Sequence, residues 1–212
     1  MKRLMLAVGL AAFAAAPAAA QWFGMPVWNS PKGGTGITVS GDFGAPNEDF
    51  GKGTAFGARG SLGLGNLTVT AGVASWKPDG ASESFTSLGG NAAFRVIGGS
   101  LLPVAINLQA GAARIGEANT EPVATRIIAG GGVSASLPTP GVSIEPYLSI
   151  TNRWTKYSGV DVESGIGWTL GANASFGLFG VHLAYDSEDF LGTTVNTVGV
   201  GAHLQLKVPL GM

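Results

Sequence analysis

The chain of 212 residues contains no cysteine, and this absence excludes several kinds of site at once. Without cysteine there is no disulfide framework, no thiolate metal site and no cysteine nucleophile. Charged residues are also scarce, at 12% of the chain compared with roughly 25% in an average soluble domain. A disordered chain would be rich in charge and poor in apolar residues, whereas 45% of this chain is hydrophobic. The composition therefore predicts a folded protein with unusually few charges.

Neither sign of charge dominates the sequence. Twelve Lys and Arg residues stand against 13 Asp and Glu residues, which gives a formal net charge of −1. There is no basic cluster to bind phosphates, so we exclude nucleic acid as a partner. The glycine run at 130–132 neither opens a helix nor carries the Lys and Ser or Thr of a phosphate-binding loop. We therefore expect no cofactor.

The first twenty residues have the three parts of an export signal. Lys2 and Arg3 are positive, an apolar run of about 13 residues follows, and three alanines at 18–20 precede a cleavage site before Gln21. The apolar run is shorter than the roughly 20 residues that a spanning helix needs. We expect residues 1–20 to be a cleaved signal peptide, with an uncleaved N-terminal anchor as the alternative.

Most of the remaining chain alternates between apolar and small polar residues with a period of two, which is typical of β-strands. In the last segment Val198 and Val200 share one face, while Gly199 and His203 share the other. Ten such segments are expected, near residues 35–44, 53–63, 67–76, 84–97, 102–114, 123–136, 142–154, 164–176, 179–186 and 194–209. Because the segment at 179–186 is short, eight strands are the alternative.

Pro146 interrupts one of these segments at a place where a fully paired strand would need a backbone N–H. Either Pro146 marks a bulge, or the strand begins after it. In the second case Glu145 belongs to the rim of the sheet.

The expected connections alternate between two kinds. The longer, polar ones are residues 45–52, 77–83, 115–122, 155–163 and 187–193, and short connections lie between them. In an up-and-down meander, alternate connections lie at opposite ends of the sheet, so one end carries long loops and the other carries tight turns. Eleven of the 13 acidic residues fall in or beside the long loops, Asp186 and Glu188 among them.

This pattern resembles the outer-membrane β-barrel proteins of Gram-negative bacteria. The resemblance rests on the export signal, the even strand count and a strand face without charge, and it covers about residues 35–210. It implies an all-β fold, a closed antiparallel up-and-down transmembrane β-barrel of about 10 strands formed by residues 35–212. The long loops would lie outside the cell and both termini at the tight-turn, periplasmic end. Outer-membrane lipid and the outer-membrane assembly machinery are the partners that it implies.

Residues 21–34 precede the first strand and form an N-terminal periplasmic or interfacial segment. This segment can lie at the periplasmic membrane interface, pack into the barrel mouth or be disordered. Trp22 and Trp28 favour the interface, where tryptophan is enriched.

Few charged or titratable residues fall on the polar strand face, and we expect them to line the lumen. These candidates are Asp42, Arg59, Arg95, Arg126, Glu145, His182, His203 and Lys207. They form either a network of ion pairs that braces the barrel, or a polar lining that lets small solutes pass. A lumen with excess base would favour anions.

The two histidines are the candidates for chemistry. Pairing the last two strands about a long loop sets His182 opposite about residue 198 and leaves roughly 13 Å between His182 and His203, too far to share a metal ion. Asp186 lies on the same face as His182, but no third member of a catalytic group is evident. We therefore expect no enzyme, and no catalytic, cofactor-binding or metal-binding residues.

Three functions follow from this reading. The first is an integral outer-membrane barrel with a structural or surface role, or with a narrow passive pore for small solutes. The alternative is a soluble exported β-barrel that binds a small apolar ligand, with the apolar face turned inward. The third is a membrane-embedded hydrolase that depends on His182. The first two place opposite strand faces on the outside, so the structure separates them.

Overall fold

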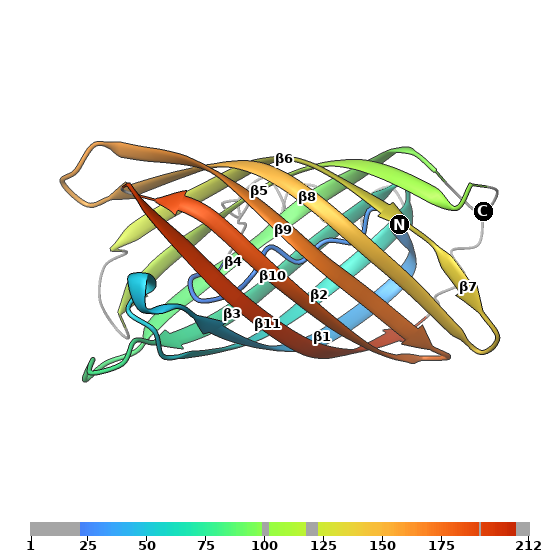
Figure 1. Ribbon diagram of the computed structural model, residues 1–212, viewed down its shortest axis with the longest axis horizontal. Helices are drawn as coiled ribbons and strands as arrows, with labels where there is room; N and C mark the ends of the chain where they lie inside the picture. The colour runs from blue at the N-terminus through green and yellow to red at the C-terminus, as the bar shows by residue number, and fades with distance from the viewer. Residues whose placement is uncertain (1–21, 99–101, 118–122, 191, 207–212) are drawn as a thin grey trace, which may run out of the picture.

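The computed structural model describes residues 22–98, 102–117, 123–190 and 192–206 (Figure 1). The expected signal peptide at 1–20 and Lys207 lie outside these ranges. The strands are β1 (Gly34–Pro46), β2 (Thr54–Gly65), β3 (Leu67–Lys77), β4 (Phe85–Ile97), β5 (Val104–Glu117), β6 (Ala124–Ala135), β7 (Leu137–Thr139), β8 (Val142–Tyr157), β9 (Val162–Phe176), β10 (Phe179–Phe190) and β11 (Thr193–Leu206). A single 3-10 turn, η1 (Glu48–Phe50), follows β1 in the described ranges. No helix in the described part of the chain is long and apolar enough to cross a membrane.

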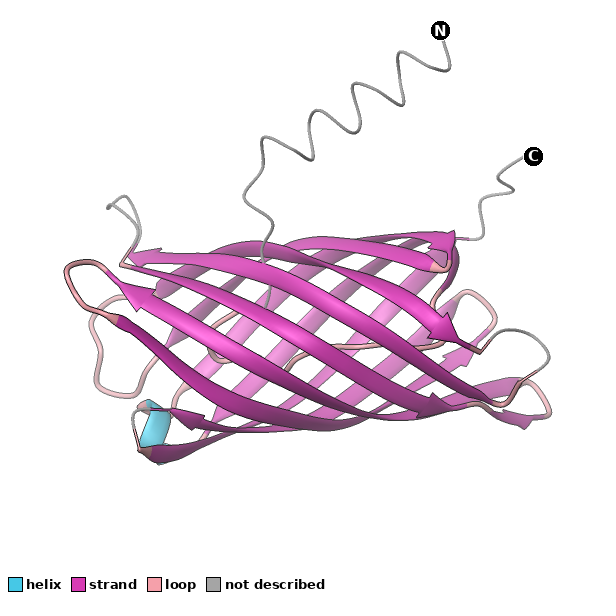
Figure 2. Cartoon of the chain, turned by 90° about the horizontal axis from the view of Figure 1, so that it is seen from above, coloured by secondary structure: helices cyan, strands magenta, loops and turns pink. Residues whose placement is uncertain are grey.

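The long strands form a closed antiparallel barrel. Each pairs with the next along the chain, β6 pairs with β8 across the short β7, and β1 pairs with β11 to close the ring (Figure 2). Closure at this seam extends from Ile37 opposite Leu206 to Pro46 opposite Thr197. The predicted ten-strand barrel is confirmed, and the count of eight is wrong.

Pro146 neither forms a bulge nor delays its strand, because β8 begins at Val142 and its pairing with β9 continues past Pro146 without a shift. The effect falls on the other neighbour of β8. Pairing with β6 stops at Ser134 and resumes in the same register as β7 from Leu137. Since proline has no N–H to donate, this break lies where Pro146 would face β6. Glu145 is buried inside the barrel rather than at its rim.

The apolar strand face points outward. Leu183 is 57% exposed and Leu170 is 55% exposed, and they lie among many large apolar side chains on the outer surface. A continuous apolar surface of this kind is unstable in water and fits a lipid environment. The alternative with the apolar face turned inward is therefore wrong.

Aromatic side chains lie near both ends of this outer face. Phe43 and Phe56 pack together near the long-loop ends of β1 and β2 with ring centroids 5.3 Å apart, and Phe179 is exposed beside a tight turn. The outer face is not wholly without charge, because Arg114 and Lys156 are exposed near the long-loop ends of their strands. Both are paired to Thr125 of β6, so they lie in one row across three strands.

The N-terminal segment lies inside the barrel, which differs from the interfacial placement expected for it. We call residues 22–33 the lumen segment; it crosses the interior as an irregular chain, drawn in blue in Figure 1. Trp22 donates from Nε1 to the carbonyl of Gly72, and Phe23 donates from its backbone N–H to Ser87. The lumen can hold this segment because its wall is rich in small residues, so the tryptophans are buried against protein instead of lipid.

Glycines on neighbouring strands make room for the large side chains of the lumen. A Cβ atom at Gly167 would lie 2.1 Å from Arg153 Cζ, and one at Gly171 would lie 2.4 Å from Tyr147 Cζ. Both distances are far below a van der Waals contact. Glycine at these positions therefore determines where a bulky side chain can cross the lumen.

Candidate functional site

The long-loop half of the lumen holds a buried network of ion pairs. Arg153 Nη1 and Nη2 donate to the two carboxylate oxygens of Asp186, at 2.7 and 2.8 Å, and Nη1 also donates to Glu188 at 3.0 Å. Arg126 forms a second ion pair with Glu188. Two arginines thus meet two carboxylates, and their charges balance within a region sheltered from water.

The lumen segment is tied into this network and seals this half of the barrel. The backbone N–H of Val27 donates to Asp186 at 3.3 Å, and the Arg126 guanidinium lies over the Phe23 ring at 5.6 Å from its centroid. Met25 and Val27 are each only 2% exposed. Side chains with so little exposed surface leave no room for a wide water-filled channel along this part of the described chain.

Further along, the segment is held by amide and carboxylate groups of the wall. Asn29 and Asn107 exchange side-chain hydrogen bonds at 2.8 and 3.2 Å. Glu145 accepts from Ser30 Oγ at 2.7 Å and from the Lys32 backbone N–H at 2.9 Å. The segment is therefore fixed along its length before the chain turns into β1.

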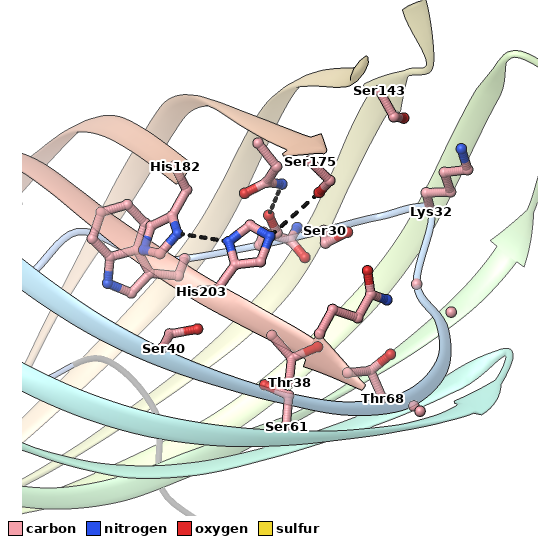
Figure 3. A pocket seen from close by; sticks show the side chains of 18 of the residues that line it. Ser30, Lys32, Thr38, Ser40, Ser61, Thr68, Ser143, Ser175, His182 and His203 are labelled. Atoms are coloured by element: carbon pink, nitrogen blue, oxygen red, sulfur yellow. Dashed lines mark hydrogen bonds between the residues drawn. The ribbon is translucent and has the colours of Figure 1, made fainter. Parts of the chain in front are cut away.

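The tight-turn half of the lumen is open and forms a cavity of about 960 Å³, which we call the turn-end cavity (Figure 3). Its wall consists mainly of serine, threonine, asparagine and glycine. Lys32 and Arg59 contribute positive charge, and no carboxylate lines it among the described residues. The cavity is therefore hydrophilic and suited to neutral or anionic solutes.

A chain of four side chains runs along the wall of this cavity. Asp42 Oδ1 lies 2.6 Å from His182 Nε2. His182 Nδ1 lies 3.2 Å from His203 Nδ1, and His203 Nε2 lies 3.3 Å from Ser175 Oγ (Figure 3). Arg59 flanks it and donates from Nε to Asp42 at 2.8 Å. The Trp28 ring of the lumen segment packs edge-on against His182, with centroids 4.6 Å apart.

The roughly 13 Å expected between the two histidines is wrong. The hairpin of β10 and β11 is tight, with Phe190 paired to Thr193, whereas a long loop had been expected there. The tighter turn sets His182 opposite Gly201, so that His203 is only two positions away on the neighbouring strand. Their rings are therefore nearly parallel, with centroids 5.4 Å apart.

Two glycines allow the four side chains to meet. Gly180 lies between Ser175 and His203 in the strand pairing, and a Cβ atom there would be 2.2 Å from His203 Nε2. Gly201 lies between His182 and Asp42 in the same way, and its Cβ atom would be 2.2 Å from His182 Nε2. Each glycine thus leaves an imidazole free to reach across a strand to its partner.

The distance between the two histidines no longer argues against a shared metal ion. Two ring nitrogens 3.2 Å apart are close enough to bind one ion, but a metal site needs at least a third protein ligand. Within the described residues, no group of three or more His, Cys, Asp or Glu side chains is placed to hold a metal. The hydrogen-bonded arrangement therefore describes the pair better.

The lumen candidates expected from the sequence fall into three places. Asp42, Arg59, His182 and His203 meet in the chain just described, and Arg126 belongs to the long-loop network. Glu145 holds the lumen segment, and Arg95 donates to the Lys32 carbonyl beside the turns. Lys207 lies outside the described residues.

Three important lumen residues are missing from that expectation. Arg153 is almost fully buried, and Asp186 and Glu188 belong to β10 rather than to a rim loop. The sequence pattern places Asp186 on the His182 face, although it is not among the expected lumen candidates, and strand parity would place Glu188 there too if the expected strand did not end at residue 186. Ser175 carries no distinguishing pattern, because serine is common along this face.

Comparison with known proteins addresses the class of the barrel. No family model matches the sequence, and comparison with curated proteins finds no match. Among solved structures, the chain is similar to the β domain of the Bordetella autotransporter BrkA, with a TM-score of 0.56 and 10% identity over 82% of this chain and 100% of that one. The chain has the fold of the bacterial outer-membrane β-barrel proteins.

Other outer-membrane barrels match with lower scores. They include the N-terminal β-barrel domain of Pseudomonas aeruginosa OprF, with a TM-score of 0.41 and 12% identity over 82% of this chain and 99% of that one. LpxR from Salmonella typhimurium matches with a TM-score of 0.49 and 8% identity over 81% of this chain and 100% of that one.

The expectation that this outer-membrane barrel is not an enzyme is overturned. It depended on two histidines too far apart to act together and on the lack of a third member. The structure brings His182 and His203 into contact and connects them to Ser175 at one end and to Asp42 at the other. A hydroxyl, an imidazole base and an orienting carboxylate are the parts that nucleophilic catalysis requires.

Proposed function

We propose that the chain is exported to the outer membrane, where its barrel has a structural or surface role and contains a one-ended vestibule. The observation that carries this proposal is the burial of the lumen segment across the long-loop half of the barrel. The export signal at 1–20 and the apolar outer face support the location. Outer-membrane lipid would contact that face, and the outer-membrane assembly machinery would insert the barrel.

The lumen segment argues against a permanently open pore. A solute that entered the turn-end cavity would have to displace Val27 and its neighbours to reach the long-loop end. Displacement would break the hydrogen bonds to Asp186 and Asn107 together and would expose buried apolar side chains. Small solutes would therefore enter the vestibule from the tight-turn end and leave by the same route.

Conductance across planar bilayers tests this seal. We expect the intact mature protein to show no steady ion conductance, and a variant that lacks residues 22–31 to conduct. Because the chain has no cysteine, Asn29→Cys with Asn107→Cys provides a unique tether between the segment and the wall.

The tethered variant is the control for movement of the segment. It should be as silent as the intact protein when oxidised and when reduced. Steady conductance in the intact protein and in the reduced tethered variant, lost when the tethered variant is oxidised, would show that the segment moves aside and would support a gated pore instead. Equal conductance in the intact, tethered and shortened proteins would contradict the seal altogether.

A further inference from the structure

We propose that Ser175 is the nucleophile of an ester-hydrolysing site in the turn-end cavity, with His203 as its general base. This activity goes beyond the structural role proposed above and does not depend on whether the lumen conducts ions. It rests on the four linked side chains from Asp42 to Ser175, on the two glycines that make room for them and on the cavity that the Ser175 hydroxyl faces.

One assignment of protons satisfies the three contacts that link Asp42, His182, His203 and Ser175. In this assignment Arg59 Nη2, which lies 3.1 Å from His182 Nε2, donates to Asp42 Oδ1 instead. An ionised Asp42 accepts from His182 Nε2–H, which leaves His182 Nδ1 to accept from His203 Nδ1–H. His203 Nε2 then has a free lone pair and accepts from the Ser175 hydroxyl. Each group faces the atom it needs, and the serine proton points at a base that is itself oriented by a further partner.

The contact between Ser175 and His203 at 3.3 Å is longer than an ideal hydrogen bond. Catalytic hydrogen bonds are often long before substrate binds and shorten in the complex, so this distance is compatible with general-base catalysis. Ser175 and His203 lie on the two strands that flank Gly180. Their backbones are therefore roughly 10 Å apart, and the two side chains meet over the glycine.

Burial decreases along the chain toward the cavity. Asp42 and His182 are buried, whereas His203 and Ser175 are half-buried and line the cavity. The network ends on an accessible hydroxyl beside a space of about 960 Å³, a feature that bracing of the wall does not require. The arrangement instead places the orienting groups behind the reacting ones, as acyl transfer requires.

The lining of the cavity indicates the class of substrate. Hydroxyl and amide groups predominate, and the apolar lining is limited to Trp28, Ala93 and Val142. There is accordingly no slot for a long acyl chain, while hydroxyl groups of a substrate would find many partners. We infer a short-chain ester of a polyhydroxylated alcohol. The absence of carboxylates among the described lining residues also means that a carboxylate product meets no like charge in the cavity.

The reaction needs only the ester and water. Ser175 Oγ attacks the ester carbonyl carbon as its proton passes to His203 Nε2. The tetrahedral intermediate then expels the alcohol, which takes that proton and leaves an acyl group on Ser175. A water molecule attacks this acyl group, again giving a proton to His203, and the carboxylic acid leaves as Oγ recovers the proton.

The test uses the folded mature protein in mild detergent. The probes are p-nitrophenyl acetate, p-nitrophenyl palmitate and a fluorophosphonate that reacts covalently with activated serines. We expect hydrolysis of the acetate at least tenfold faster than of the palmitate, and fluorophosphonate attachment at Ser175 as located by mass spectrometry. Ser175→Ala and His203→Gln should each lower the acetate rate at least a hundredfold.

Ser164→Ala is the control, because Ser164 lies on the same strand as Ser175 but is exposed near the long-loop end of β9 and does not line the cavity. This variant should keep both the rate and the labelling. An acetate rate unchanged in Ser175→Ala, labelling at another serine, or no hydrolysis and no labelling in the intact protein would each overturn the proposal. Faster cleavage of the palmitate would overturn the substrate class.

His182 and Asp42 are positioning residues in this scheme, and a rate loss alone would not distinguish that role from a structural one. We expect His182→Gln to lower kcat at least tenfold and to shift the acidic limb of the pH–rate profile, because the partner of His203 Nδ1 has changed. Heat-modifiable mobility in gels monitors folding of every variant. A lower kcat with an unchanged pH profile would assign His182 a structural role only.

Discussion

The imidazole rings of His182 and His203 stack at an angle of 22°, with their Nδ1 atoms 3.2 Å apart, although 21 positions separate the two residues in the chain. They belong to adjacent strands and occupy diagonal positions on the lumen face. Each ring uses its second nitrogen to contact a different strand, β1 through Asp42 and β9 through Ser175. The pair therefore links four consecutive strands across the seam at which the barrel closes.

Gly180 should be intolerant of any side chain. In Gly180→Ala the new Cβ atom would lie 2.2 Å from His203 Nε2 and 2.6 Å from the Ala174 carbonyl oxygen, so the ring must move away from Ser175 and the backbone beside it must shift. We expect at least a tenfold loss of acetate hydrolysis with the barrel still folded. Gly60→Ala is the control, because its Cβ atom would meet nothing within 4 Å. Equal rates in the two variants would show that the position of His203 is irrelevant to the reaction.

Arg153 should be the most costly lumen residue to remove. Arg153→Met leaves the carboxylates of Asp186 and Glu188 without their shared partner in a buried region, which typically costs about 3–5 kcal/mol. Urea unfolding in detergent measures the free energy of unfolding. Lys156→Met, three residues away on the exposed outer face, should change it by less than about 1 kcal/mol. A similar loss in both variants would contradict a structural role for the buried network.

Leu183 should resist replacement by a charged residue. It lies on the outer face near the middle of β10, where an arginine in lipid costs about 2–4 kcal/mol. We expect Leu183→Arg to lower the folded fraction in lipid vesicles, as measured by the heat-modifiable gel shift. Val160→Arg, at a position 54% exposed in the loop before β9, should fold normally. If both variants fold equally well, the outer face does not contact hydrocarbon.

The orientation of the barrel can be tested with single cysteines, because the chain has none of its own. We expect Val160→Cys, in a long loop, to react with a membrane-impermeant maleimide on intact cells. Leu178→Cys, in the tight turn between β9 and β10, should react only after the outer membrane is opened. The reverse pattern would invert the orientation and place the turn-end cavity on the cell surface.

The strands and their faces could be predicted from the sequence because a barrel wall repeats one simple rule. Val198 and Val200 point outward and Thr197 points inward, as a period of two requires. Every strand obeys this rule independently of its neighbours, so an error in one does not affect the next. The same rule places Arg114 outward at the end of β5, so the expectation that failed was a face without charge, not the alternation.

The site could not be predicted because it depends on register between strands. Extending β10 to Phe190 changes the partner of His182 from about residue 198 to Gly201 and turns a distant pair into a contact. Ser175 enters the chain only through Gly180, which is one of 35 glycines and has no local feature that marks it. The lumen segment was unpredictable for a similar reason, since its partners come from six different strands.

The hydrogen bonds of the lumen segment have a consequence for how the barrel assembles. Its partners include Gly72, Ser87, Asn107, Glu145 and Asp186, which surround it on all sides. A segment enclosed in this way cannot enter between the strands once β1 and β11 have paired. It must either bind to the open sheet before closure or pass into the lumen through one end of the barrel afterwards. In the first case the segment acts as a template around which the sheet closes. Pairing of β1 with β11 and ordering of the lumen segment would then be a single cooperative event.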